Sequence, residues 1–234
     1  MIRVAVTGLG AISAGGQTTS QTWEAVRDGR SAIGPLKIAR QEYVRCRIAA
    51  QVADYDPADH FGGRQSTPLD PFSQFAVIAA REALATSGLD RQSDAVSRAA
   101  CIVGIGVGGI CTLDDAFYRL YHDNNPRVHP LTVPRLMCNA APSQISMDLG
   151  LHGISYAIAS ACASGTHAIG QAAQLIRSGA ITVAFAGGAE ACIAVGTIVG
   201  WEALRVLSAD TCRPFSRNRS GLVLGEGAGM LVLE

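Results

Sequence analysis

Hydrophobic positions along the chain follow two periods. Short apolar runs are typical of buried strands, and they cover residues 2–8, 99–103, 155–159, 181–186 and 227–234. Between them, apolar residues recur at helical spacing over residues 21–27, 70–87, 112–121, 134–149 and 166–179, with a shorter helical stretch near 201–205. Strands that alternate with helices predict an α/β fold with a mainly parallel sheet. The last two strands follow each other with no complete helix between them, which predicts one antiparallel member.

Composition and charge narrow the class of protein. The chain has 234 residues, of which 48% are hydrophobic and only 16% are charged, and its net charge is zero. A neutral chain gives no indication of a nucleic-acid partner or of a polybasic membrane patch. No apolar run reaches the length of a membrane span, and residues 1–6 are typical of a strand and not of a signal peptide. We therefore expect a cytoplasmic protein that needs much of its apolar surface covered, either by its own chain or by a partner.

The cysteines give no indication of a metal site or a cofactor. No two of them are closer than ten residues, so the C-x-x-C pair that would predict zinc or a redox dithiol is missing. Their number is odd and the chain carries no secretory signal, which favours reduced thiols. The seven are Cys46, Cys101, Cys111, Cys138, Cys162, Cys192 and Cys212.

One of these thiols stands where a predicted strand passes into a predicted helix. Cys162 lies in the small-residue turn 160–165, between the strand at 155–159 and the helix at 166–179. The free N–H groups and the positive dipole at a helix start favour a thiolate and could hold an oxyanion. Cys162 is therefore a candidate nucleophile. The alternative is a small buried residue, which free cysteine often is.

Two glycine-rich stretches follow predicted strands. Residues 9–16 predict a turn, and Gly104, Gly106 and Gly109 match the G-x-G-x-x-G pattern of dinucleotide-binding loops. That pattern needs an acidic residue about twenty positions later to hold a ribose, and residues 128–130 are Val-His-Pro. We therefore favour glycines that let backbone segments pack closely over a nucleotide site.

Four motifs along the chain carry a resemblance to a known family. They are Val-Thr-Gly-Leu-Gly at 6–10, Ser-Ala-Cys-Ala-Ser-Gly at 160–165, Ala-Gly-Gly-Ala-Glu at 186–190, and Arg-Pro-Phe-Ser at 213–216 followed by Gly-Glu-Gly-Ala-Gly at 225–229. In order and spacing they resemble the N-terminal half of a β-ketoacyl-acyl-carrier-protein synthase of the elongating type II kind, in the thiolase superfamily. Residues 201–207 and 210–216 are closer still to nodulation-protein-E-like synthases. The resemblance implies half of a thiolase-like fold, with a five-stranded mixed sheet and helices on its faces, as one domain over 1–234 without the C-terminal half.

The resemblance also implies an activity. Members of the family are 3-oxoacyl-[acyl-carrier-protein] synthases that catalyse a decarboxylative Claisen condensation. They act in the synthesis of fatty acids, or of specialised acyl chains and polyketides. An acyl group passes from acyl carrier protein to the nucleophile, which here is Cys162. Malonyl-carrier protein then loses carbon dioxide, and its carbanion attacks the thioester. The backbone N–H of Cys162 would be one oxyanion donor. The implied partners are acyl carrier protein and either a second copy or a second chain.

The catalytic histidines of the family are not found in this sequence. Its two histidines and its lysine belong to the C-terminal half, and none of the chain's five histidines stands in a His-Gly-Thr context: His60, His122, His129, His152 and His167. His167 lies five residues after Cys162, which is about 140° around a helix, so we favour a hydrogen-bonded helix residue over a base. We expect that this chain alone does not condense acyl chains.

Further positions carry weaker expectations from the resemblance. Val107 falls where the family separates the acyl pocket from the dimer interface, with packing as the alternative. Arg127 and Arg205 match positions that contact acyl carrier protein, with solvated surface arginines as the alternative. Residues 64–67 are poorer in basic residues than this docking region usually is, and Ser220 replaces an aspartate of many relatives, with no chemical reason evident from the sequence.

Two other classes of function stay open. The chain could be a non-catalytic subunit of the chain-length-factor type, although such subunits typically replace the nucleophile. It could also be a thiolase-fold fragment that serves assembly alone. Selective alkylation of Cys162 among the seven thiols would favour an acyl-accepting site over both.

Overall fold

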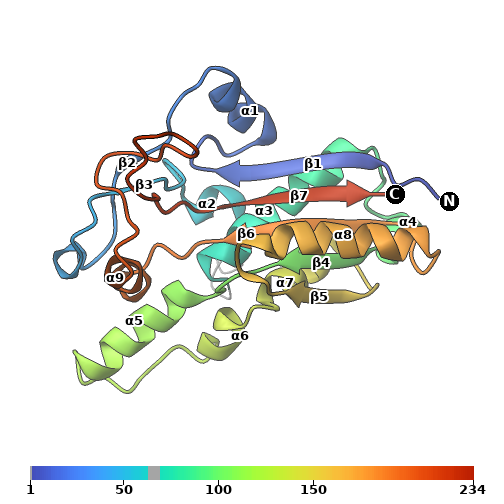
Figure 1. The fold of residues 1–234 in the computed structure, drawn as a ribbon. Coiled ribbons are helices and arrows are strands. Elements are labelled where there is room, and N and C mark those ends of the chain that lie inside the picture. Colours follow the sequence, from blue (N-terminus) through green and yellow to red (C-terminus); the bar gives the residue numbers. More distant parts are fainter. Residues whose placement is uncertain (1, 63–68) are drawn as a thin grey trace.

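A computed structural model describes residues 2–62 and 69–234, so the docking region expected at 64–67 lies outside the described residues. Its main sheet has five strands in the order β1-β7-β6-β4-β5 (Figure 1): β1 (Val6–Ser13), β4 (Ala100–Gly104), β5 (Ser155–Ile158), β6 (Ala184–Glu190) and β7 (Gly227–Leu233). Strand β4 pairs in parallel with β5 and β6, whereas β7 runs antiparallel to both β1 and β6. The predicted mixed sheet with one antiparallel member is confirmed.

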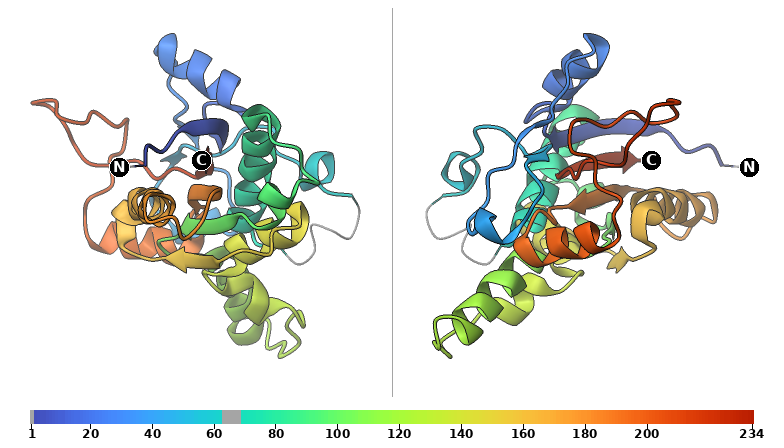
Figure 2. Two further views of the ribbon diagram at one scale, coloured as in Figure 1. Left: turned by 90° about the vertical axis from the view of Figure 1, so that its right-hand side faces the viewer. Right: turned by 60° about the vertical axis from the view of Figure 1, so that its left-hand side comes forward.

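Helices cover both faces of this sheet (Figure 2). Helices α3 (Pro71–Ser87) and α7 (Ala140–Leu149) pack on one face, and α8 (Ser164–Arg177) packs on the other. Alternation along the strands divides the core accordingly. In β4, Cys101 and Val103 belong to the α3 side, and Ile102 belongs to the α8 side. The cluster on the α8 side has fewer buried residues, and the helix contributes mainly small ones to it: Ala168 and Ala172, with Ile176.

Helix α3 is the most deeply buried helix and forms as the sequence predicts. Asp70 caps its first turn, Pro71 occupies the first helical position, and Gly88 ends it in the left-handed conformation at φ +77°. Eleven of its residues are buried. Because α3 also lies against β1 and β7, burial extends around most of its circumference.

The glycines near the N-terminus belong to a strand, so the turn predicted over 9–16 is wrong for its first half. Strand β1 begins four residues later than the predicted strand and continues to Ser13. A Cβ at Gly8 would lie 2.1 Å from the carbonyl oxygen of Ala83, and one at Gly10 would lie 1.9 Å from that of Ala79. These glycines allow α3 to approach the strand, and the chain turns only at Ala14–Gly15.

The remaining elements lie mostly at one end of the sheet: α1 (Thr19–Arg27), β2 (Gly34–Pro35), β3 (Ile48–Ala49), α2 (Pro57–His60), α4 (Asp94–Ser97), α5 (Ile110–Tyr121), α6 (Thr132–Leu136) and α9 (Val195–Ala203). The helix predicted over 134–149 is two helices, because Met137 is extended. There the segment Leu136–Cys138 packs on the loop before α5, and the Gly109 N–H donates to the Leu136 carbonyl at 3.2 Å. Within 2–62 and 69–234, no helix has the length and apolar character needed to cross a bilayer.

Candidate active site

Cys162 lies on a tight turn between sheet and helix. Strand β5 ends at Ile158, a single 3₁₀ turn covers Ala161–Ala163, and α8 begins at Ser164. The predicted passage from strand to helix is therefore confirmed. Cys162 is exposed, in contrast to Cys101, which is fully buried in β4. The alternative of a small buried cysteine does not hold at this position.

The residue before Cys162 is held in an unfavourable backbone conformation. Ala161 has φ +52°, which costs an L-residue about 1–2 kcal/mol. The buried hydroxyl of Ser164 stabilises the turn, since it accepts from the Ser160 N–H at 2.8 Å and donates to the Ala161 carbonyl at 2.6 Å. Such strain concentrates at functional sites, where it orients a side chain. Sequence reasoning missed both features, and the run of small residues at 160–165 was their only signal.

The polar groups around Cys162 leave its backbone N–H available. Among the residues that the structure describes, no partner is found for this N–H, which lies at the positive end of α8. His167 is occupied elsewhere, because its Nδ1 lies 2.7 Å from the Oγ of Ser160. His167 is thus a hydrogen-bonded helix residue, as expected, and its partner is Ser160 on the turn.

Glycines bring the start of α8 onto the ends of two strands. A Cβ at Gly104, the last residue of β4, would lie 2.2 Å from the backbone nitrogen of Gly165. A Cβ at Gly188 in β6 would lie 3.1 Å from the Cα of the same Gly165. Only glycine at these positions permits that backbone contact. The preference for close packing over nucleotide binding is confirmed at Gly104.

The backbone N–H groups of the loop after β4 are hydrogen-bonded to a side chain of the same protein. The carboxylate of Glu190, the last residue of β6, accepts the N–H groups of Gly106, Val107 and Gly108 at 2.9, 2.8 and 3.1 Å. A phosphate bound to a glycine-rich loop would need these same amides. The residues that match the dinucleotide pattern therefore form a loop whose N–H groups bind the carboxylate of Glu190. Sequence reasoning did not find this role for Glu190.

A cavity of about 680 Å³ opens beside Cys162. Val107 and Cys162 both line it, so the structure brings together two of the predicted site residues. Its larger side chains include Ile12 and Trp201, and seven of its lining residues are glycines: Gly104, Gly106, Gly165, Gly188, Gly225, Gly227 and Gly229. Cys192 lies in the same wall, where burial raises the pKa of its thiol to about 11 and keeps it neutral. The arrangement suits an apolar chain next to a thiol.

The two predicted arginines lie outside this cavity. Arg127 is exposed in the segment between α5 and α6, and Arg205 is exposed just after α9. Arg205 borders a smaller groove of about 340 Å³ together with Arg45 and Arg47. Sequence reasoning did not identify Arg45 and Arg47. The one acidic residue of that groove, Glu202, accepts the backbone N–H groups of Arg45 and Cys46, both at 2.6 Å. The groove is therefore basic.

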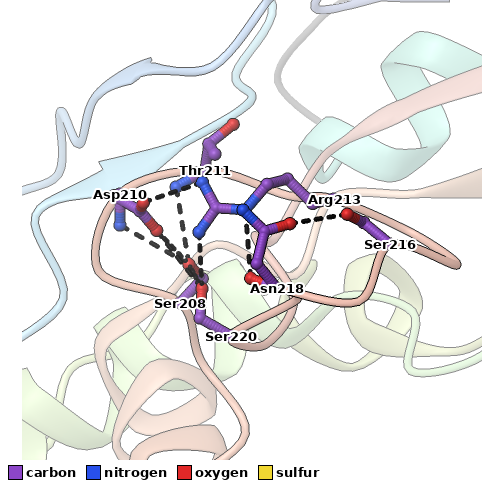
Figure 3. Close-up of polar contacts among 7 residues, drawn as sticks. All are labelled: Ser208, Asp210, Thr211, Arg213, Ser216, Asn218 and Ser220. Carbon is purple, nitrogen blue, oxygen red and sulfur yellow. Dashed lines mark hydrogen bonds and ion pairs between the residues drawn. The ribbon is translucent and has the colours of Figure 1, made fainter.

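Ser220 belongs to a polar network in the loop before β7 (Figure 3). Arg213 pairs with Asp210 at 2.9 Å and donates a longer hydrogen bond to the Ser220 Oγ at 3.3 Å, and Ser220 and Ser208 hydroxyls lie 2.8 Å apart. Arg213 holds the pKa of Asp210 well below its usual range. The carboxylate that balances Arg213 thus comes from Asp210, and Ser220 contributes a hydroxyl to the same network.

Comparisons with known proteins identify the family. Residues 1–234 match the family described as beta-ketoacyl synthase, N-terminal domain. Nodulation protein E of Rhizobium sp. (strain N33) is 40% identical over 232 residues, which are 99% of this chain and 58% of that protein. The 3-oxoacyl-[acyl-carrier-protein] synthase 2 of Staphylococcus aureus (strain MRSA252) is 36% identical over 238 residues, with 100% and 58% covered.

A solved structure shows the same fold. The ishigamide ketosynthase/chain length factor superposes with a TM-score of 0.91 at 29% identity, over 99% of this chain and 58% of that one. The chain therefore spans somewhat more than half the length of the relatives that it matches. It belongs to the β-ketoacyl synthase family and corresponds to its N-terminal, thiolase-like domain.

Proposed function

We propose that this chain supplies the nucleophile of a 3-oxoacyl-[acyl-carrier-protein] synthase, an acyltransferase of fatty acid or specialised acyl chain synthesis. The observation that carries the proposal is the position of Cys162. It is exposed on a strained turn at the start of α8 and faces an apolar cavity of about 680 Å³. A nucleophile, a free N–H and room for an acyl chain are the three needs of acyl transfer to a thiol.

The chemistry follows from these groups. The Cys162 thiolate attacks the carbonyl carbon of an acyl thioester, and the carbonyl oxygen becomes an oxyanion beside the Cys162 N–H. The intermediate collapses, the C–S bond to the carrier breaks, and the carrier leaves as a thiolate that takes up a proton. In the second half-reaction, malonyl-carrier protein loses carbon dioxide, and its carbanion attacks the Cys162 thioester. A new C–C bond forms, and Cys162 returns as a thiolate.

The second half-reaction requires more than these residues. Decarboxylation leaves an enolate that the family stabilises with two imidazoles, and no histidine of this chain stands in the family's context. His167 is engaged with Ser160. We infer that the isolated 234-residue chain accepts an acyl group but does not condense it.

The proposed partners are acyl carrier protein and a second polypeptide surface. The acyl carrier protein that relatives bind is acidic. Arg127 and Arg205 are both exposed and could contact such a protein. The basic groove at Arg205 supports that side of the proposal. Val6 and Leu9 on β1 are 54% and 47% exposed, which supports a covering partner, either a second copy or a chain that supplies the other half.

Acylation by a thioester tests the proposal directly. The purified chain is incubated with octanoyl-acyl carrier protein, and the adduct is located by peptide mass spectrometry. We expect one octanoyl group on Cys162 and none on Cys212, which is also exposed and serves as the internal control. Cys162→Ala should abolish the adduct. Equal labelling of both cysteines, or none at Cys162, would favour the non-catalytic subunit or the structural fragment.

A second assay tests the limit of the isolated chain. Malonyl-acyl carrier protein is added to the octanoylated protein, and products are analysed for a 3-oxodecanoyl thioester. We expect the octanoyl group to stay on Cys162. Steady formation of the condensed product by the 234-residue chain would show that the missing imidazoles are not required.

A further inference from the structure

Glu190 holds part of the cavity wall through hydrogen bonds from the backbone of the loop after β4. One oxygen accepts the N–H groups of Gly106 and Val107, and the other accepts that of Gly108. These three amides are consecutive and converge on a single carboxylate, which is the geometry of an anion-binding nest. Gly108 provides the left-handed turn that the nest needs, at φ +84°.

The tertiary fold explains why Glu190 reaches this loop. Strands β4 and β6 are parallel neighbours in which Gly104 is paired with Gly188. Two residues further, Gly106 and Glu190 therefore lie at the same edge of the sheet. A Cβ at Gly106 would be 2.7 Å from the Oε2 of Glu190, so a side chain there would displace the carboxylate from its present position.

The loop has few other restraints on the cavity side. The Val107 carbonyl accepts a weak hydrogen bond from the Cys138 thiol at 3.7 Å, and Gly109 bonds to Leu136 on the far side. Val107 is the central residue of the segment that Glu190 holds; it lines the cavity and is 47% exposed. Without Glu190, three adjacent amides would need other partners, and the loop would have to move to find them.

We propose that Glu190 is a positioning residue that fixes Val107 and thereby sets the length of acyl chain that the cavity accepts. This inference rests on the proposed function, since it assigns chain-length selectivity to the same cavity. Glu190 acts through the loop and not on the reacting atoms. Its effect should therefore be seen in the preference among chain lengths more than in the intrinsic reactivity of the thiol.

Alkylation with maleimides of graded length measures this preference. The protein reacts with N-ethyl-, N-butyl- and N-octylmaleimide, and mass spectrometry gives the rate constants at Cys162 and at Cys212 in the same molecules. The octyl-to-ethyl ratio at Cys162, divided by that at Cys212, reports the cavity alone. In the wild type we expect a value of about tenfold or more, because each methylene buried in an apolar site favours the longer reagent.

Two variants and a matched control decide the outcome. Glu190→Ala should change the normalised ratio by about fivefold or more, and Glu190→Gln, which keeps one acceptor oxygen, should change it less. If Glu190→Ala does not fold, Glu190→Gln carries the test. The control is Glu82→Gln, because Glu82 also accepts backbone N–H groups, from Ala11 at 2.8 Å and Thr19 at 2.9 Å, but does not line the cavity.

The failures of the two proposals are distinguishable. A wild-type ratio equal to that of Cys212 would show no acyl cavity at Cys162 and would overturn the proposed function together with this inference. A wild-type preference that Glu190→Ala and Glu190→Gln both leave within twofold would overturn the role of Glu190 alone. An equal change in Glu82→Gln would also overturn it, because general loosening of the fold would then explain the effect.

Discussion

Replacing Gly104 with alanine should disturb both the fold and the nucleophile. Gly104 is the last residue of β4, where a Cβ would lie 2.2 Å from the Gly165 nitrogen and 2.2 Å from the Ser164 carbonyl carbon. Ordinary contact begins at 3.4 Å, so strand and helix must separate by 3.4 − 2.2 = 1.2 Å. Both atoms belong to the backbone and cannot rotate away. Overpacking of this kind costs about 3 kcal/mol, near the upper end of its usual range.

The separation should also move Cys162, because the turn that carries it is continuous with α8. A displacement of about 1 Å in a catalytic group can cost roughly 100-fold in rate. We therefore expect Gly104→Ala to lower the free energy of unfolding by about 3 kcal/mol in urea titrations and to slow octanoylation of Cys162 by about 100-fold.

Gly170→Ala is the matched control within the same helix. No atom lies within 4 Å of a Cβ at Gly170, and the residue is in the interior of α8. The substitution should raise the free energy of unfolding by about 0.5–1 kcal/mol through helix propensity and leave acylation unchanged. Wild-type stability and acylation in Gly104→Ala would refute the close contact between β4 and α8.

Three further substitutions test other parts of the structure. Ser164→Ala removes the hydroxyl that bridges Ser160 and Ala161, and should lower the free energy of unfolding in urea by about 1–3 kcal/mol; an unchanged value would contradict the bridge. Phe215→Gly removes a fully exposed side chain at φ +63°, and should leave that free energy unchanged or raise it by up to about 1 kcal/mol; a clear loss would show that the ring has a contact. Burial raises the pKa of Asp70 in the folded protein, although Thr112 donates hydrogen bonds to it. The stability that this group contributes is therefore fully present below its unfolded pKa of about 3.9, and it is lost as the pH rises through the folded pKa. The advantage of wild type over Asp70→Asn should therefore shrink from pH 4 to pH 7 in urea titrations, and an advantage that grows with pH would contradict this sign.

The order of strands and helices could be predicted because periodicity is a local property. The helix at 70–87 carries its own cap at Asp70 and its own stop at Gly88, so its bounds follow from the sequence alone. The continuation of β1 to Ser13 could not be predicted in this way. Gly8 and Gly10 are typical of a turn, and their reason for being glycine lies more than 60 residues away in α3. The break at Met137 likewise depends on a contact with the loop before α5.

In the candidate site, too, features set by neighbouring residues could be predicted, whereas features set by long-range contacts could not. Cys162 could be placed at a helix start because strand, turn and helix follow each other in the chain. The left-handed conformation of Ala161 is held locally by Ser164, but small residues alone do not specify it. The hydrogen bonds from the loop at 106–108 to Glu190 depend on parallel strands that are far apart in sequence. The basic groove at Arg205 was missed for the same reason, since Arg45 and Arg47 reach it from the β3 side of the molecule.

The abundance of glycine around the cavity limits how its specificity can evolve. Where seven lining residues have no side chain, the walls are backbone, and no single substitution at those positions can make the space larger. Replacement of Gly229, whose Cβ would meet nothing within 4 Å, could only shorten the chain that fits. Widening is open to a few side chains, among them Val107 and Trp201. Selection for shorter substrates thus has many routes in this protein, whereas selection for longer ones has few.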